Sequence, residues 1–269
     1  MTRLCRLFGV TRPGYYAWRQ RALSAHARQD RVLLEEMRAI FERSGGTYGS
    51  PRMYRALKAR GHQLSHRRVE RLMREGGWRA RAARVYRRTS GTHRWFAQHP
   101  NRIRNVVTTA VNQVWVGDLT YVSVAGRWWY LAAVLDQYSR RLLAYRVGQT
   151  RNTAFTRGVL DAALRRRQPA PGLIFHSDRG SEFLGAPFHA QLVAHGAEQS
   201  MTRGGEPDEN AHMESFFHSL KAELIHGRVF GTVGDLRQCL RQYARFYNRE
   251  RLHSALGYQS PVDYERGAA

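Results

Sequence analysis

The chain has 269 residues, of which 42% are hydrophobic and 11% aromatic, and its 44 basic against 21 acidic side chains give a formal net charge of +23. This composition excludes a disordered chain, and no apolar run approaches the roughly 20 residues that cross a bilayer, so we expect no membrane partner. Such a basic chain is expected to bind a polyanion. The excess lies in residues 1–110, with 25 basic and 6 acidic side chains, against 19 and 15 in residues 111–269.

The cysteines and the N-terminal segment carry no sign of export. Cys5 and Cys239 lie far apart and form no CxxC pair, which argues against a disulfide framework and against a cysteine zinc site. The first residues lack the apolar core of a secretory signal. We therefore expect a cytoplasmic protein with two reduced thiols.

The first third of the chain predicts helices. Residues 1–27 are expected to be a helical N-terminal segment, broken at VTRPG and resuming at YYAWRQR, that belongs to an incomplete upstream domain. Apolar residues at helical intervals predict a helix over 30–41, and a proline in a first-turn position begins another over 51–60. Ser65 is a suitable N-cap for a third helix over 66–75.

Two short helices joined by a turn that contains glycine are typical of a helix-turn-helix, so residues 28–80 predict a DNA-binding domain. The apolar residues of the third helix can face the core, which leaves four arginines outward. These are Arg67, Arg68, Arg71 and Arg74. We interpret them as DNA contacts, and a merely solvated basic face is the alternative.

The rest of the chain predicts a linker and a catalytic region. Residues 81–110 carry many arginines without clear periodicity, and we interpret them as a basic linker that follows phosphates. In residues 111–269, strands come first, then alternating helices and strands, then two long helices. That order predicts an α/β fold in which helices cover a mixed sheet.

Two aspartates lie where a charge is costly. Asp118 lies inside a run of Val, Trp and Leu, and Asp178 closely follows the apolar residues 173–175. A charge in or at the end of a buried strand needs a partner or a metal ion. For Asp178 the alternative is a turn-forming role before RGS, and for Asp118 a purely structural role is the weaker alternative because its neighbours are so apolar.

The segment PDENAHMESFFHSLKAE predicts a helix that starts at Pro207. Its apolar stripe is Met213, Phe216, Phe217, Leu220 and Leu224. At about 100° per residue, Asn210, Glu214 and Lys221 fall on one edge of that stripe, whereas Glu223 points away into solvent. Helical phase therefore selects Glu214 as the acid that can reach a site on the sheet.

Three carboxylates from two strands and a helix suit a pair of hard divalent cations. Two Mg²⁺ ions about 3.5 to 4 Å apart can activate the attacking oxygen and stabilise the leaving oxygen of a phosphodiester. We expect the basic surface to bring a nucleic acid, and the three acids to hold the metal.

These motifs resemble those of a known superfamily. WVGDLTY, HSDRGSEF and DENAHMESFFHSLKAE are similar to the three motifs of DDE transposases and retroviral integrases, and the steps of 60 and 36 positions between Asp118, Asp178 and Glu214 also match. The tail YNRERLHSALGYQSPVDY resembles the closing signature of insertion-sequence transposases of the IS-three family, in particular their OrfB subunit. The resemblance covers nearly the whole chain.

The resemblance implies a ribonuclease-H-like integrase core, with a mixed five-stranded sheet and flanking helices, preceded by a small all-α helix-turn-helix domain. It implies that Asp118 bridges two Mg²⁺ ions, for which Mn²⁺ can substitute, while Asp178 completes one and Glu214 the other. Lys221, seven positions after Glu214, matches the basic residue that contacts element-end DNA. The implied activity exposes a 3′-hydroxyl at an element end and joins it to another phosphodiester.

The family also implies partners and a location. The partners are double-stranded DNA, as the terminal inverted repeats and the target, further copies of the chain, and an upstream OrfA partner or a frameshift fusion to it. The implied location is the bacterial cytoplasm, with nucleoid association on DNA. In two places the chain departs from many relatives, with Glu182 in place of Gln and GEPDENA in place of GNCYDNA. Glu182, Asn210 and His218 are secondary candidates for the site.

Two other functions stand beside a transposase. A ribonuclease-H-like nuclease without strand transfer shares the three acids, but it leaves the tail signature and the basic N-terminal third unexplained. A non-catalytic, repressor-like DNA-binding remnant is opposed by the intact set of acids.

Overall fold

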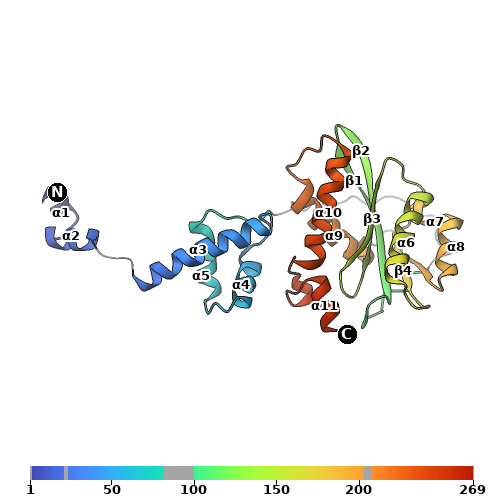
Figure 1. The fold of residues 1–269 in the computed structure, drawn as a ribbon, viewed down its shortest axis with the longest axis horizontal. Helices are drawn as coiled ribbons and strands as arrows, with labels where there is room; N and C mark the ends of the chain where they lie inside the picture. Colours follow the sequence, from blue (N-terminus) through green and yellow to red (C-terminus); the bar gives the residue numbers. More distant parts are fainter. Residues whose placement is uncertain (1, 21–23, 82–99, 203–206, 269) are drawn as a thin grey trace. The chain divides into compact units, whose positions relative to one another are not determined.

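The computed structural model describes residues 2–20, 24–81, 100–202 and 207–268, and the chain divides into two compact units, Met1–Ala80 and Arg81–Ala269 (Figure 1). Most of the predicted basic linker and most of the GGEP segment lie outside the described residues. In the described part, no helix is both long enough and apolar enough to cross a membrane.

The first unit begins with two short helices, α1 (Thr2–Leu7) and α2 (Arg12–Gln20). The prediction that the second helix resumes at Tyr15 is wrong, because α2 already includes Pro13 and Gly14 in its first turn. Proline is favoured at that position, since its missing N–H would have no partner within the helix.

Three further helices form the rest of the first unit: α3 (Ala25–Arg43), α4 (Ser50–Ala59) and α5 (His66–Glu75). α3 starts before the predicted residue 30, because the Ser24 hydroxyl accepts the Ala27 N–H at 3.1 Å and caps the helix earlier. The buried side chains of these helices are Leu33, Met37, Ile40, Met53, Leu57, Val69, Leu72 and Met73. Their burial holds the three helices together.

The second unit is built on a five-stranded sheet of order β3-β2-β1-β4-β5. The strands are β1 (Val114–Val124), β2 (Arg127–Asp136), β3 (Leu142–Gly148), β4 (Ile174–Ser177) and β5 (Glu198–Met201). β1, β2 and β3 are antiparallel, whereas β4 pairs in parallel with both β1 and β5. The predicted mixed sheet of five strands is therefore confirmed.

Helices cover both faces of this sheet (Figure 1). On one face lie α6 (Thr153–Arg167), α7 (Ser181–Leu184) and α8 (Ala186–Ala194), which share a core with Trp115 and Phe175. On the other lie α9 (Ala211–Leu220) and α10 (Val233–Arg249). The segments beyond α10 are a 3₁₀ turn, η3 (Ser254–Leu256), and α11 (Pro261–Gly267).

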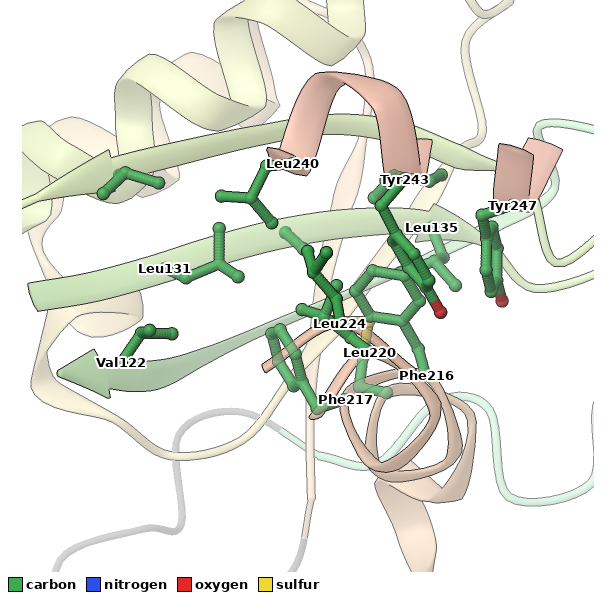
Figure 2. Packing of buried hydrophobic residues seen from close by; sticks show 14 of the residues in the cluster. Val122, Leu131, Leu135, Phe216, Phe217, Leu220, Leu224, Leu240, Tyr243 and Tyr247 are labelled. Atoms are coloured by element: carbon green, nitrogen blue, oxygen red, sulfur yellow. The ribbon is translucent and has the colours of Figure 1, made fainter. Parts of the chain in front are cut away.

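The predicted apolar stripe of α9 is buried, and Figure 2 shows it packed with Leu131 and Leu135 of β2 and with Leu240 and Tyr243 of α10. A 3₁₀ turn, η1 (Pro207–Asn210), leads into α9, and a π-helical turn, η2 (Lys221–Ile225), follows it. Each large apolar side chain buried in this way stabilises the fold by about 1.5 to 3 kcal/mol. The burial of this stripe therefore fixes which edge of α9 borders the sheet.

Candidate active site

Two predicted carboxylates directly follow paired positions of neighbouring strands. Gly117 of β1 and Ser177 of β4 are register partners in the parallel pair, and Asp118 and Asp178 are the next residues. Neighbouring strands lie about 4.8 Å apart, so the two acids leave the sheet from adjacent backbone positions. Both are half-buried, which leaves them within reach of a ligand.

Both aspartates belong to the face of the sheet that α9 covers. Side chains alternate along a strand, so Asp118 shares the face of Val116, which lies in the core with α9 and α10. By the same alternation Asp178 shares the face of His176, the register partner of Val116. The sheet therefore presents both acids toward the helix that carries Glu214.

The backbone around the two aspartates is fixed by close contacts. Asp118 Oδ1 accepts the Leu119 N–H at 2.6 Å, and Asp178 Oδ1 accepts the Gly180 N–H at 3.1 Å. A Cβ on Gly117 would lie 2.5 Å from Cζ of Phe175, whose ring is fully buried. Glycine before Asp118 is thus what leaves room for the Phe175 ring against β1.

Asn210 ties the start of α9 to the strand that carries Asp118. Its side chain is buried, and its Nδ2 donates to the Gly117 carbonyl oxygen at 3.4 Å. Glu214, four residues further, is exposed on α9. Because Asn210 is the N-cap of α9, its contact anchors the start of the helix that carries Glu214 to the strand of Asp118.

Two more predicted residues lie along α9 and η2. His218 is exposed one turn beyond Glu214. Lys221, the first residue of η2, is half-buried, and its Nζ lies 5.1 Å from the ring centroid of Tyr121 in β1. This cation–π contact holds the ammonium against the strand that bears Asp118.

The oxygen donors at the site match a hard divalent cation in kind. Besides the aspartate carboxylates, Asn210 Oδ1 is buried and has no hydrogen-bond partner among the described residues. Oxygen ligands of this type are those that Mg²⁺ prefers. In the described ranges, however, no group of three or more His, Cys, Asp or Glu side chains is arranged to hold a metal ion. Asp118 and Asp178 start from adjacent backbone positions, but together with Glu214 they do not form such a group.

Glu182, the additional acid four residues after Asp178, is buried in α7 with only 5% of its surface exposed. The Ser181 hydroxyl donates to its Oε2 at 3.3 Å, and Arg151 Nε lies 3.9 Å from the same oxygen. Its carboxylate therefore acts as an ion-pair partner on the α7 side of the sheet.

His176 is a residue of the site that the sequence reasoning missed. It is fully buried on β4, two residues before Asp178, and burial lowers its pKa to about 4. Its Nδ1 lies 2.9 Å from the Ser200 hydroxyl of β5. The available signal was a single polar side chain within the apolar strand LIFHS.

The prediction that Glu223 points into solvent is wrong, since only 9% of it is exposed. Arg251 Nη2 donates to Glu223 Oε1 at 2.7 Å, and the Tyr243 hydroxyl donates to Oε2 at 2.9 Å. Burial alone would lower the pKa of Arg251, but the hydrogen bonds to Glu223 outweigh it and raise that pKa. Helical phase failed here because η2 is π-helical and because the partner comes from the C-terminal segment.

The four arginines predicted to contact DNA divide into two pairs. Arg68 and Arg71 bind Asp30 of α3 through Nη2 at 2.7 and 2.6 Å, and the hydrogen bond from Arg71 lowers the pKa of that aspartate. The prediction that Arg68 points outward is therefore wrong, because it is half-buried against α3. Arg67 and Arg74 are exposed on α5.

Family models match most of the chain. A model described as an HTH-like domain matches residues 27–86, and two models described as integrase core domains match residues 108–207 and 195–261. The matches thus place an HTH-like domain before an integrase core domain.

Known proteins give the same result. The chain is 36% identical to the insertion element IS600 uncharacterized 31 kDa protein of Shigella sonnei, over 97% of each chain. It is 35% identical to transposase InsF for insertion sequence IS3A of Escherichia coli (strain K12), over 97% of this chain and 92% of that protein. A chain of the simian T-cell lymphotropic virus intasome in complex with PP2A regulatory subunit B56 gamma shares the fold, with 12% identity, a TM-score of 0.50, and coverage of 78% of this chain and 69% of that one. The chain therefore belongs to the insertion-sequence transposases of the IS-three family, within the DDE transposase and retroviral integrase superfamily.

Proposed function

We propose that this transposase cuts the ends of its insertion sequence and joins the exposed 3′-hydroxyl to DNA by two-metal phosphodiester transesterification. One observation carries the proposal. Asp118 and Asp178 follow register partners of two parallel strands, and Glu214 lies on the helix that Asn210 ties to that same register. Such an arrangement of oxygen donors on a basic chain suits phosphodiester chemistry.

In this proposal each acid has its own role. When bound, two Mg²⁺ ions, or Mn²⁺ in their place, supply the charge that activates the attacking oxygen and stabilises the leaving oxygen. Asp118 would contribute to both ions, Asp178 to one and Glu214 to the other. Asn210 positions the helix, and the buried imidazole of His176 supports the strand beneath Asp178.

The two proposed reactions balance without a further co-reactant. In the first, a water oxygen attacks phosphorus and the bond to the 3′-oxygen breaks, which leaves a 3′-hydroxyl at the element end. In the second, that hydroxyl oxygen attacks another phosphodiester, so one P–O bond forms as one breaks. Lys221, held against Tyr121, would bind a DNA phosphate near the reacting bond.

The partners follow from these reactions. The substrates would be double-stranded DNA, as the terminal inverted repeats and the target. Arg67 and Arg74 of α5 would contact phosphates, while Arg68 and Arg71 hold that helix on α3. We also propose a homo-oligomer on DNA, with an OrfA partner or a fusion to it, associated with the nucleoid in the bacterial cytoplasm.

The test uses labelled element-end DNA with Mg²⁺ and compares the wild type with Asp118→Asn, Asp178→Asn and Glu214→Gln. Strand-transfer products that vanish in all three variants support the proposal. Glu198→Gln is the matched control, because Glu198 is an exposed glutamate whose side chain forms a surface ion pair with Arg102. Undiminished activity of Glu214→Gln would contradict the assigned site.

The same assay separates the other functions. Metal-dependent cleavage without joining would favour a nuclease. Binding without any metal-dependent chemistry, both with and without the upstream partner, would favour a repressor-like remnant.

A further inference from the structure

A groove with a volume of about 690 Å³ lies along the outer edge of the sheet, beside β3 and between α6 and α10. Among the described residues that line it, none is acidic. Five of the lining residues are arginines: Arg141, Arg166, Arg241, Arg245 and Arg249. We call it the arginine groove. No element of the proposed chemistry uses it.

The floor of the arginine groove is closed to an added strand at its centre. Asn248 Nδ2 donates to the Leu142 carbonyl oxygen at 2.9 Å, and Asn248 Oδ1 accepts the Leu142 N–H at 2.9 Å. Arg166 Nη1 donates to the Leu143 carbonyl oxygen at 3.2 Å. Because side chains already bind these backbone groups, a peptide cannot pair with β3 there.

Three of the arginines form a row on α10. Arg241, Arg245 and Arg249 are spaced four residues apart and all are exposed. Like charges four apart lie about 6 Å from each other and destabilise a helix. Within the described ranges, none of the three forms a salt bridge. The row therefore costs stability unless an anion lies against it.

The charges of both walls act on the same point of the groove. Burial raises the pKa of Tyr145 on β3, while the positive charges of Arg241 on α10 and Arg166 on α6 oppose that rise. Since Arg166 of α6 and the arginines of α10 line the same groove, its two walls form one positive surface.

We infer that the arginine groove binds the phosphodiester backbone of duplex DNA, as a second DNA surface of the catalytic unit. Duplex DNA carries one negative charge per about 1.7 Å of its axis, which matches a closely spaced row of cations. A second copy of this chain docked through the same groove would set these arginines against their own equivalents, and like charges across an interface disfavour association.

The position of the groove fits that role, and the inference rests on the proposed action on DNA. Tyr145 pairs with Ala133, and Ala133 pairs with Asp118, so the three residues lie in one row across the sheet. The groove is therefore two strand spacings, roughly 10 Å, from the strand that carries Asp118. DNA held there would remain close to the reacting end.

The test measures the affinity of the full chain for a duplex of random sequence over a range of NaCl concentrations. All variants carry Asp118→Asn, so that no cleavage occurs. Arg241→Gln with Arg245→Gln removes two charges from the groove, and Arg127→Gln with Arg157→Gln removes two exposed charges elsewhere in the same unit. The slope of log K against log salt is negative, and each lost phosphate contact makes it less steep by about 0.9.

In the groove variant the slope of log K against log salt should become less steep by about 1 to 2, and the affinity near 0.1 M salt should fall at least about tenfold. The control pair should change both quantities far less. Arg241→Lys with Arg245→Lys keeps the charges and should keep the slope. Thermal unfolding of all variants should agree, since glutamine and lysine are good helix formers.

An unchanged slope in the groove variant would overturn the inference. So would a loss of self-association in sedimentation with DNA binding intact, because the groove would then be an interface between copies. Failure of the wild-type chain to bind any DNA would instead sink the proposed function together with the groove. Normal strand transfer by wild-type protein with an unchanged groove slope would sink the groove alone.

Discussion

The acids at the candidate active site and the acids on the α10 and α11 side of the same unit differ in their surroundings. Asp118, Asp178 and Glu214 are half-buried or exposed. Glu223 and Glu265, by contrast, have carboxylates that arginines enclose. An acid left accessible beside the sheet can serve chemistry, whereas an acid enclosed by arginine contributes to stability.

The largest expected effect is on activity. Asp118→Asn should reduce strand transfer roughly 10⁴-fold, because it removes a donor to both proposed ions. The unfolding midpoint should stay the same or rise, since active-site acids are commonly unfavourable for stability. A joining assay in Mg²⁺ beside thermal denaturation checks both, and addition of EDTA to the wild type should abolish joining as fully. A large loss of stability in Asp118→Asn would instead mean that Asp118 has a structural role.

The next effect is on stability. Arg251→Met removes the buried guanidinium that lies 2.7 Å from the Glu223 carboxylate, and it should lower the free energy of unfolding of the second unit by about 3 to 5 kcal/mol. Adding Glu223→Leu to that variant should recover part of the loss, because the buried carboxylate is then removed together with its arginine. Urea denaturation measures both. Arg165→Met, which breaks an exposed pair with Asp161, should cost under about 1 kcal/mol.

Glu265 adds a pH dependence to the enclosed acids. Burial alone would raise its pKa, but hydrogen bonds from Arg167, Ser139 and Arg141 outweigh it and hold the pKa below the ordinary 4.5. Its contribution is therefore complete above pH 4.5 and is lost as the pH falls through the lowered folded-state value. Glu265→Gln should lower the free energy of unfolding by about 2 kcal/mol at pH 7. The difference from wild type should shrink as the pH falls below 4.5. Urea midpoints of wild type and Glu265→Gln, measured from pH 7 down to acidic pH, test this prediction. A difference between the two proteins that does not change with pH would contradict it.

The smallest effect concerns Lys221. It lies two residues from Glu223 in η2, but it belongs to the candidate active site and not to the enclosed acids. Lys221→Ala should reduce joining about tenfold and lower the salt slope of DNA binding by about 0.9, with stability nearly unchanged. Lys221→Arg keeps the charge and should retain most of the activity. If Lys221→Ala instead destabilised the protein as Arg251→Met does, the two regions would not be separate.

Local pattern predicted much of the helical structure. α5 occupies His66–Glu75, as its sequence indicated, and every residue of the predicted stripe in α9 and η2 is buried. α3 and α2 were misjudged at their starts, where a serine cap and a proline in the first turn decided the boundary. The roles of Asp118, Asp178 and Glu214 stay predictions, because motif spacing indicates chemistry but does not measure it.

The sequence by itself determined the charge imbalance, the fold class and the family, since composition, periodicity and motif spacing are written along the chain. It took the packing of distant elements to show that the backbone positions of Asp118 and Asp178, 60 positions apart, are neighbours, and that Arg251 encloses Glu223. That packing also decided that arginines of β3, α6 and α10 line one groove. The physical reason is that periodicity describes one element at a time, whereas the partner of a buried or clustered charge depends on how distant elements pack.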